Sequence, residues 1–366
     1  MENTFIQMIQ DCPNAKSWEI QQMQRATLPL VLYGTGGYAK GLVAFLGEFD
    51  LKPRIACVDK TYFRANRWEG LDVVPVEEVG TRYPNFNALI GFSDFKLARE
   101  KLRQLPGCQK IFFLDSTLSL DFFDYSYVAR QQDEFQRTFD LLADEWSRKT
   151  CVAFVNAKIS GRPDDLYDLV VPDQYFPAGI FTLHDREVFV DVGAYDGDTI
   201  LNFIKQAGGT YARIYALEPD ADSFGKLSAM VKKDHLRDVI LLNKGAWRDS
   251  TVLRFNRHSN IKARSSIAET GETQIGVVAI DQVVGPEGAT YIKMDVEGAE
   301  LAALQGAEQT IRKFKPKLAV SVYHKPEDLV EIPRYLHSLV PGYSFYLRHH
   351  LHITHELVLY AVWPGA

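Results

Sequence analysis

Short apolar runs alternate with amphipathic segments along most of the chain. In the first third, predicted strands alternate with predicted helices, a pattern typical of βαβ units and a parallel sheet. The elements expected there are helices over residues 3–24, 38–46 and 94–105, and strands at 28–33, 54–59, 88–91 and 110–114.

The alternation stops between about residues 120 and 185 and then begins again. Within the interruption, residues 133–146 have helical spacing of their apolar side chains. The final two strands are separated only by residues 349–355, too few for a helical crossover, so an antiparallel hairpin is expected. The strands predicted in the second half lie at 187–191, 214–217, 239–242, 251–255, 275–280, 291–294, 318–322, 343–348 and 356–363.

These patterns predict an α/β protein in three parts. Residues 1–120 are expected to form a Rossmann-like domain that binds a nucleotide or the substrate, and residues 121–185 a connector with its own helix. Residues 186–366 are expected to form a second α/β domain with a terminal antiparallel hairpin. A length of 366 residues agrees with two domains at roughly 100–200 residues each.

Composition weighs against two classes of partner. Lys and Arg number 41 and Asp and Glu 47, a net charge of −6, whereas nucleic-acid-binding proteins usually carry a basic face. No apolar stretch approaches the roughly 18–20 residues of a membrane span, and the first residues lack a secretory signal, so no membrane insertion is expected. The four cysteines form no CxxC or Cys/His pattern, which favours a reduced, cytoplasmic setting.

The first glycine loop, GTGGYAK at residues 34–40, holds a lysine and no acid. Backbone N–H groups at Gly34, Gly36 and Gly37, with a helix N-terminus behind them, favour an anion. Asp59 ends the next strand, near the spacing at which an acid meets a ribose. A pyrophosphate-bearing ligand suits this loop, but such loops also serve as tight strand-to-helix turns, and both interpretations stay open.

The second loop, DVGAYDGDT at residues 191–199, contains three carboxylates, at Asp191, Asp196 and Asp198. Like charges disfavour a phosphate there, whereas a ligand with an ammonium or sulfonium group is favoured. Asp196 and Asp198 can also cap a helix that begins near Thr199, and both roles are compatible. Glu218 ends the following strand, where a carboxylate can accept hydrogen bonds from ribose hydroxyls.

Several motifs in the second half resemble the FkbM family of S-adenosylmethionine-dependent methyltransferases. Five or so parallel strands followed by an antiparallel hairpin is also the strand plan of class I methyltransferases. The motifs are VDVGAYDGDT (190–199), LEPD (217–220), LNKGAW (242–247), AIDQVV (279–284), IKMDVEGAELAALQGA (292–307), SVYHKPEDL (321–329), FYLRHH (345–350) and ELVLYA (356–361).

This resemblance implies transfer of a methyl group from S-adenosylmethionine to oxygen, often a sugar hydroxyl in a glycan or glycosylated natural product. It places Asp191, Gly193 and Asp196 near the methionine end of the cofactor and Glu218 on its ribose, with residues 243–247 beside the adenine. The cofactor-binding residues expected in these motifs are Asp191, Gly193, Tyr195, Asp196, Glu218, Pro219, Gly245, Ala246 and Asp295.

The first domain resembles, more loosely, the nucleotide-sugar-binding domain at the N-terminus of bacterial sugar acyltransferases. The matching residues are YGTGGYAKG (33–41), VDK (58–60) and IGFSDFKLARE (90–100). This resemblance implies that the first domain presents a nucleotide-linked or otherwise anionic substrate.

Candidate catalytic residues follow apolar strands, because ligands of open α/β sheets lie beyond the carboxyl ends of the strands. Asp295, Glu297 and His324 meet this condition, and His324 is the preferred general base since histidine titrates near neutrality. Asp295 and Glu297 are expected to orient the substrate or to touch the cofactor amine. Their oxygens are compatible with Mg²⁺, but no metal ion is predicted. A structural role for His324 remains the alternative.

Two other features of the sequence are candidates for contact with a ligand. His349, His350, His352 and His355 cluster between the last two strands, where a solvated turn facing the substrate is favoured over a metal site. Arg348, directly before them, is a candidate contact for an acidic or phosphorylated substrate group, as is the basic stretch 254–264.

The sequence therefore predicts a cytoplasmic O-methyltransferase that acts on a sugar, a nucleotide-linked sugar or a glycan. Its partner is expected to be that small-molecule or glycan acceptor, without nucleic acid, and a homo-oligomer is left open. Two alternatives are a non-catalytic binding protein on a methyltransferase scaffold and an NAD-dependent enzyme that uses the first domain.

Overall fold

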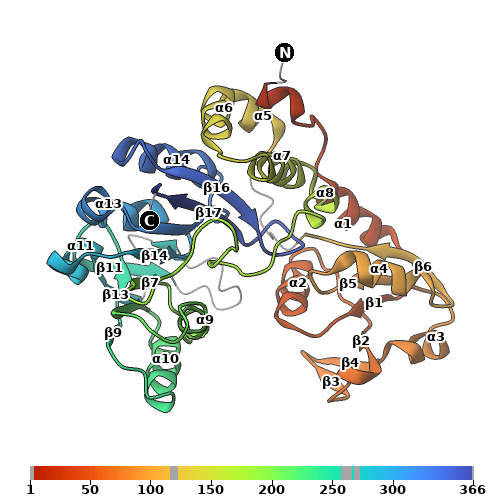
Figure 1. The fold of residues 1–366 in the computed structure, drawn as a ribbon. Coiled ribbons are helices and arrows are strands. Elements are labelled where there is room, and N and C mark those ends of the chain that lie inside the picture. Colours follow the sequence, from red (N-terminus) through yellow and green to blue (C-terminus); the bar gives the residue numbers. More distant parts are fainter. Residues whose placement is uncertain (1–3, 116–122, 257–265, 268–272, 365–366) are drawn as a thin grey trace.

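The computed structural model describes residues 4–115, 123–256, 266–267 and 273–364. It has two α/β lobes, drawn in red to orange and in green to blue, with a helical segment in yellow above the junction between them (Figure 1).

The first lobe is built on a six-stranded sheet with the order β3-β4-β2-β1-β5-β6. Only the short edge strand β3 runs antiparallel, to β4. The parallel strands, taken in chain order, follow the third-second-first-fourth-fifth arrangement seen in Rossmann folds. The strands are β1 (Leu30–Tyr33), β2 (Ile55–Val58), β3 (Arg67–Trp68), β4 (Leu71–Pro75), β5 (Phe86–Ile90) and β6 (Cys108–Phe112).

The helix expected over residues 3–24 is wrong, because the structure divides it. A 3-10 helix covers Phe5–Met8, and α1 (Ala15–Arg25) begins only after Pro13. Asn14 ends the intervening segment as the N-cap of α1, since its side chain accepts a hydrogen bond from the Lys16 N–H. The other helices of this lobe are α2 (Gly37–Gly47), α3 (Val79–Arg82) and α4 (Phe95–Arg103).

The connector is more helical than its pattern predicts. The single helix expected at 133–146 is wrong, because Leu142 is extended and Asp144 starts a new helix by accepting a hydrogen bond from the Ser147 N–H. That helix continues to Gly161, whose positive φ of 68° ends it. The connector helices are α5 (Tyr125–Arg130), α6 (Gln132–Leu141), α7 (Glu145–Ser160) and α8 (Asp164–Tyr167).

The second lobe has a seven-stranded sheet with the order β16-β17-β15-β14-β7-β8-β9. Five strands are parallel, and β17 and β16 form an antiparallel hairpin at one edge. The predicted class I methyltransferase fold with a terminal hairpin is therefore confirmed. The strands are β7 (Val188–Val192), β8 (Arg213–Leu217), β9 (Val239–Leu242), β14 (Tyr291–Met294), β15 (Lys317–Ser321), β16 (Ser344–His349) and β17 (Leu357–Val362).

The predicted strands at 251–255 and 275–280 lie outside this sheet. They correspond to β11 (Thr251–Asn256) and β13 (Thr273–Val278), which pair antiparallel in a separate four-stranded sheet with β10 (Gly245–Ala246) and β12 (Ser266–Ile267). The helices of this lobe are α9 (Asp198–Gln206), α10 (Ala221–Lys233), α11 (Ile280–Val284), α12 (Glu300–Gln305), α13 (Glu308–Phe314) and α14 (Asp328–Leu339).

The terminal hairpin joins the parts of the chain. Along β16, the Leu347 N–H donates to the Ser147 hydroxyl of α7 over 2.9 Å. At the hairpin tip, Ile353 packs in the core of the first lobe, and the Thr354 N–H donates to Asp115 over 3.1 Å. In Figure 1 the hairpin accordingly reaches from the blue sheet to the orange lobe.

The domain boundaries at residues 120 and 185 stay a prediction. Phe5, at the start of the chain, packs in the same hydrophobic core as Val190 of β7. Among the described residues, no helix combines the length and the apolar character needed to cross a membrane.

Candidate functional site

The turn after β7 packs directly against the turn after β14. Gly193 has a φ of 81°, and a Cβ at this position would overlap the carbonyl oxygen of Asp295. Only glycine satisfies both the conformation and the space. The predicted residue Gly193 therefore keeps the ends of β7 and β14 in contact.

Glu218 connects the same turn to the end of β8. One carboxylate oxygen accepts a hydrogen bond from the Tyr195 N–H over 2.9 Å, and the other from the Asp220 N–H over 2.8 Å. A carboxylate offers about four lone-pair sites, so Glu218 retains capacity for ribose hydroxyls. Burial is the main cause that raises the pKa of its carboxyl.

The segment after β9 lies beside this turn. The Asn243 side chain donates to the carbonyl oxygens of Glu218 and Pro219, over 2.8 and 3.3 Å. A Cβ on Gly245 would come within 3.8 Å of the Pro219 side chain, and Ala246 is buried. The predicted residues Glu218, Pro219, Gly245 and Ala246 are thus neighbours.

Asp191 lies under this surface rather than on it. Its side chain is fully buried and pairs with Lys293 of β14, with Nζ 3.1 Å from Oδ1. Lys293 also donates to the Gly193 carbonyl oxygen over 2.7 Å. The pair therefore supports the backbone of the turn from below, and Asp191 acts on a ligand only through it in this geometry.

The two other acids of the turn do not act as N-cap side chains. Helix α9 begins at Asp198, and its N-cap is Gly197, which has a φ of 94°. Asp198 accepts a hydrogen bond from the Thr199 N–H over 2.7 Å, whereas Asp196 is partly buried in the turn. The predicted capping role is wrong because the helix starts one residue earlier than expected.

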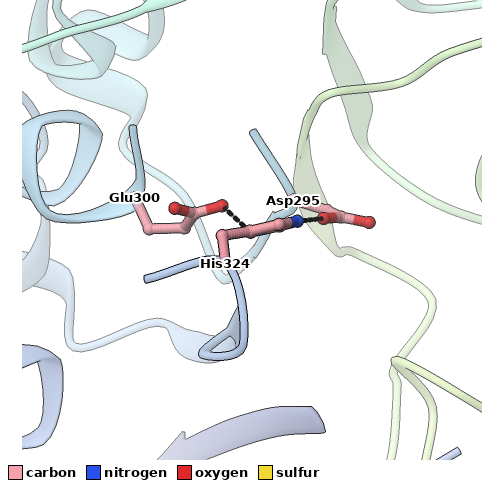
Figure 2. A group of neighbouring side chains, drawn as sticks. All are labelled: Asp295, Glu300 and His324. Atoms are coloured by element: carbon pink, nitrogen blue, oxygen red, sulfur yellow. Dashed lines mark ion pairs between the residues drawn. The ribbon is translucent and has the colours of Figure 1, made fainter. Parts of the chain in front are cut away.

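His324 joins the candidate catalytic residues into one group. Its Nδ1 lies 2.8 Å from Glu300 Oε1, and its Nε2 lies 3.5 Å from Asp295 Oδ1 and 3.5 Å from Glu297 Oε2. The imidazole ring lies between the carboxylates of Glu300 and Asp295 (Figure 2). The structure thus brings together the predicted residues Asp295, Glu297 and His324.

Glu300 is a member of this group that the sequence did not single out. It is fully buried at the first position of α12, and its Oε1 also accepts a hydrogen bond from the Val296 N–H over 3.0 Å. Glu297 and Gly298 have φ values of 54° and 93° and form the turn before α12. The turn they make places Glu297 beside Nε2 and Glu300 beside Nδ1.

The charges around His324 stabilise its protonated form. Burial alone would lower the pKa of the ring, but the hydrogen bond to Glu300 and the charges of Glu300, Asp295 and Glu297 outweigh it and raise the pKa to about 9. Partial burial, with Asp295 and Glu300 nearby, raises the pKa of Glu297 to about 7, against the opposing charge of His324. Both groups therefore titrate within two pH units of neutrality.

Tyr175 of the connector also contacts the group. Its hydroxyl donates to Asp295 Oδ2 over 2.8 Å, and its ring packs 5.1 Å from the Lys293 ammonium. The sequence offered no signal for Tyr175, because 120 residues separate it from Asp295. Lys293 did carry a signal, since a lysine in a buried apolar strand requires a partner.

The same side chains have the composition of a metal site. Asp295, Glu300 and His324 each offer a ligand atom, and these atoms lie within 4.8 Å of one another. A metal ion would need both carboxylates at one ring nitrogen, whereas they lie at opposite nitrogens here. This arrangement favours two carboxylates that pair with opposite nitrogens of one imidazole.

In the glycine loop of the first lobe, the backbone conformation and close packing explain why one position, residue 34, is a glycine. Gly34 has a φ of 121°, and a Cβ there would come within 3.0 Å of the Gly91 carbonyl oxygen. Gly36 and Gly37 begin α2, and an added Cβ would meet nothing within 4 Å at either. Binding of a nucleotide by this loop stays a prediction.

Asp59 lies at the end of β2, as expected, but its carboxylate has partners within the lobe. It accepts a hydrogen bond from the Tyr33 hydroxyl over 3.0 Å and pairs with Lys101. A ribose at this position would have to share the carboxylate with both.

The histidines of the terminal hairpin do not form a solvated turn. His349 is fully buried, and His350 bonds the Val171 carbonyl oxygen and the Tyr360 hydroxyl over 2.9 and 2.8 Å. The histidines are shielded because the hairpin packs against the connector. Arg348 pairs with Asp144 over 2.6 Å, and its contact with an acidic or phosphorylated substrate group stays a prediction. Most of the basic stretch 254–264 lies outside the described residues.

Comparisons with known proteins agree with this architecture. Residues 191–345 match the family model described as the methyltransferase FkbM domain, which confirms the predicted family for that part of the chain. The structure is similar to that of a methyltransferase FkbM from Methylobacillus flagellatus KT, with 24% identity over 97% of this chain and 94% of that chain and a TM-score of 0.70. The shared fold therefore extends over both lobes.

Two further solved structures are similar to about half of the chain. One is an rRNA methylase from Streptococcus thermophilus, with 16% identity over 50% of this chain and 90% of that chain and a TM-score of 0.33. The other is an Aeropyrum pernix fibrillarin in complex with S-adenosyl-L-methionine, with 15% identity over 50% and 69% and a TM-score of 0.32. No curated protein sequence matches the chain.

Proposed function

We propose that this protein is an S-adenosylmethionine-dependent methyltransferase that methylates a hydroxyl group, since residues 191–345 match the methyltransferase FkbM domain. The acceptor is a sugar, a nucleotide-linked sugar or a glycan. The observation that carries this proposal is the geometry of His324, whose Nδ1 lies 2.8 Å from the buried Glu300 and whose Nε2 faces Asp295 and Glu297.

This geometry suits removal of a proton from an alcohol. A neutral hydroxyl is a weak nucleophile, and a positioned base typically contributes 10²- to 10⁴-fold to the rate. Glu300 fixes the ring through Nδ1, as the carboxylate of a catalytic triad does, which leaves Nε2 to accept the hydroxyl proton. The hydroxyl oxygen gains the methyl group, and its proton passes to Nε2 of His324.

Glu297 is the alternative base. Its carboxylate lies 3.5 Å from Nε2, and its pKa of about 7 is suited to proton transfer near neutrality. In that case His324 remains protonated and stabilises negative charge on the hydroxyl oxygen. The two assignments differ in the pH at which activity appears.

The residues around the turn after β7 fit S-adenosylmethionine. This cofactor supplies an electrophilic methyl group on a sulfonium, and its positive charge suits the carboxylates of Asp196, Glu218 and Asp295. Glu218 would hold the ribose, since half of its lone-pair sites remain for hydroxyl groups. The Asn243 segment and Pro219 would border the adenine, and Tyr195 would lie beside them.

We infer a cytoplasmic setting and a small-molecule or glycan acceptor without nucleic acid, in line with the net charge of −6. The first lobe would present a nucleotide-linked or anionic acceptor, as the resemblance of its glycine loop to sugar acyltransferases implies. A homo-oligomer remains compatible with this proposal.

A mass-spectrometric screen for products 14 Da heavier, over nucleotide sugars and cell-envelope glycans, tests the proposal. We expect an O-methylated product with the wild type, a 10²- to 10⁴-fold slower reaction with His324→Gln, and an S-adenosylmethionine affinity in His324→Gln that calorimetry finds unchanged. His235→Asn, at the exposed end of α10, is the control because asparagine tolerates its φ of 50°. A product methylated on nitrogen or carbon, or full activity in His324→Gln, contradicts the proposal.

A further inference from the structure

A cavity of about 630 Å³ lies where the three parts of the chain meet. Its wall includes Asn14 and Lys16 at the start of α1, Lys158 near the end of α7, and the loop after β15 with His324 and Lys325. The volume lies within the range of small-molecule sites. One wall of the cavity is thus the candidate base of the methyl-transfer site.

Two lysines also line the cavity. Lys16 is 6% exposed, and Lys158 is partly buried with its Nζ 5.4 Å from the centre of the Phe154 ring. Both interact electrostatically with Asp115, which is 1% exposed and also accepts the hydrogen bond from Thr354. The two ammonium groups therefore share the carboxylate of Asp115.

Asn14 keeps the two lysines on the same wall. Its side-chain oxygen accepts a hydrogen bond from the Lys16 N–H over 2.9 Å, and its amide donates to the carbonyl oxygens of Lys158 and Ile159. The N-terminus of α1 is thereby held against the end of α7. The positive end of the α1 dipole adds to the charge of the lysines.

Two acids also line the cavity. Asp124 is engaged as the N-cap of α5, accepting a hydrogen bond from the Tyr127 N–H over 2.7 Å. Asp11 is exposed to solvent, where its charge is screened.

We propose that this cavity binds a phosphate group of the methyl acceptor, held by Lys16 and Lys158, with the rest of the acceptor extending toward His324. The inference rests on the proposed function, because it takes His324 as the place of methyl transfer. It assigns the acceptor to phosphate-bearing sugars or sugar nucleotides. This phosphate site lies at the junction of the lobes and is separate from the Gly34 loop.

The ionisation of Lys158 agrees with an anion site. Burial lowers its pKa to about 8, Asp115 opposes the shift, and the charge of Lys16 adds to it. A bound phosphate stabilises the ammonium form, so the pKa of Lys158 rises when phosphate binds.

Calorimetric titration with inorganic phosphate tests the cavity without an identified acceptor. We expect binding by the wild type, at least tenfold weaker binding by Lys158→Gln, and recovery with Lys158→Arg, which keeps the charge. Lys149→Gln is the matched control, since Lys149 lies on the same helix with 61% of its side chain exposed and pairs only with Glu145 among the ion pairs of the described residues. Circular dichroism and thermal unfolding check that each variant is folded.

S-adenosylmethionine binding, measured on the same samples, separates the two proposals. The anion site is overturned if the wild type binds the cofactor but not phosphate, or if Lys158→Gln binds phosphate as tightly as the wild type does. Either result leaves the proposed function standing. Loss of cofactor binding in the wild type overturns the proposed function instead. Weakened phosphate binding in Lys149→Gln to the same extent as in Lys158→Gln also overturns the assignment, because it indicates nonspecific surface charge.

Discussion

Glu300 Oε1 lies 2.8 Å from Nδ1 of His324, and this contact determines which ring nitrogen faces the carboxyl edge of the sheet. The carboxylate is fully buried and its other oxygen, Oε2, accepts no hydrogen bond from the described residues. A buried carboxylate in this position both orients the ring and raises its basicity. Glu300 is therefore a positioning residue for the proposed base.

Substitution of Glu300 by glutamine tests this positioning role. A hydrogen bond to a charged group contributes roughly 1.5–3 kcal/mol, so kcat should fall roughly 10- to 150-fold if the whole contribution is expressed in the transition state. The affinity for S-adenosylmethionine should not change. Glu308→Gln, at a half-exposed position on α13 where the carboxylate pairs with Arg312, provides the control. An unchanged kcat in Glu300→Gln would remove Glu300 from the mechanism.

Titration of His324 by NMR checks the electrostatics without an acceptor. We expect a pKa of about 9 in the wild type and a lower value, closer to 6.5, in Glu300→Gln. Because the folded-state pKa is raised, this group stabilises the fold fully below about pH 6.5, and the contribution disappears as the pH rises through 9. A wild-type pKa at or below 6.5 would refute the carboxylate chain around the ring.

The pH dependence of kcat distinguishes the two candidate bases. A base acts only when deprotonated, so activity rises with pH through its pKa. A limb near pH 9 assigns the base to His324, and a limb near pH 7 assigns it to Glu297. In a Glu297→Gln variant, a limb that belongs to Glu297 should disappear, whereas a limb that belongs to His324 should persist at a lower pH, because the charge of Glu297 contributes to the raised pKa of His324.

Replacement of Gly193 by alanine should disrupt the turn after β7. The positive φ costs about 1–3 kcal/mol for a residue with a Cβ, and the added atom would displace the Asp295 carbonyl. We expect a lower melting temperature and weaker cofactor binding. Gly225→Ala on α10 is the control, because nothing lies within 4 Å of its Cβ and alanine stabilises a helix by roughly 0.5–1 kcal/mol.

The buried pair of Asp191 and Lys293 should be essential for stability. Lys293→Met leaves a buried carboxylate without its partner, which destabilises by roughly 3–5 kcal/mol. The double variant Asp191→Asn with Lys293→Met should lose less than the sum of the single variants in urea unfolding, because the two residues are in contact. Lys205→Met at the exposed end of α9 should be neutral, and additive losses would contradict the pairing.

Local sequence patterns predicted most of the second sheet because each strand is a short apolar run with a turn at its end. The boundaries that failed were decided by single residues. Pro13 and Asn14 divided the first helix, and Asp144 began a helix inside a predicted one. Such effects depend on the backbone conformation of single residues, which apolar periodicity does not predict.

The sequence by itself determined the family of residues 191–345, the class I strand plan and the strand ends at which Asp295 and His324 lie. These features are local, since motifs and apolar periodicity can be recognised in the sequence without knowing which residues are in contact. Only the tertiary structure decided which side chains meet: Glu300 at Nδ1 of His324, Tyr175 at Asp295, and Lys16 beside Lys158. Contacts between residues far apart in the chain arise from packing of whole elements. The chemistry of the site therefore depends on distances between side chains that cannot be derived from the sequence.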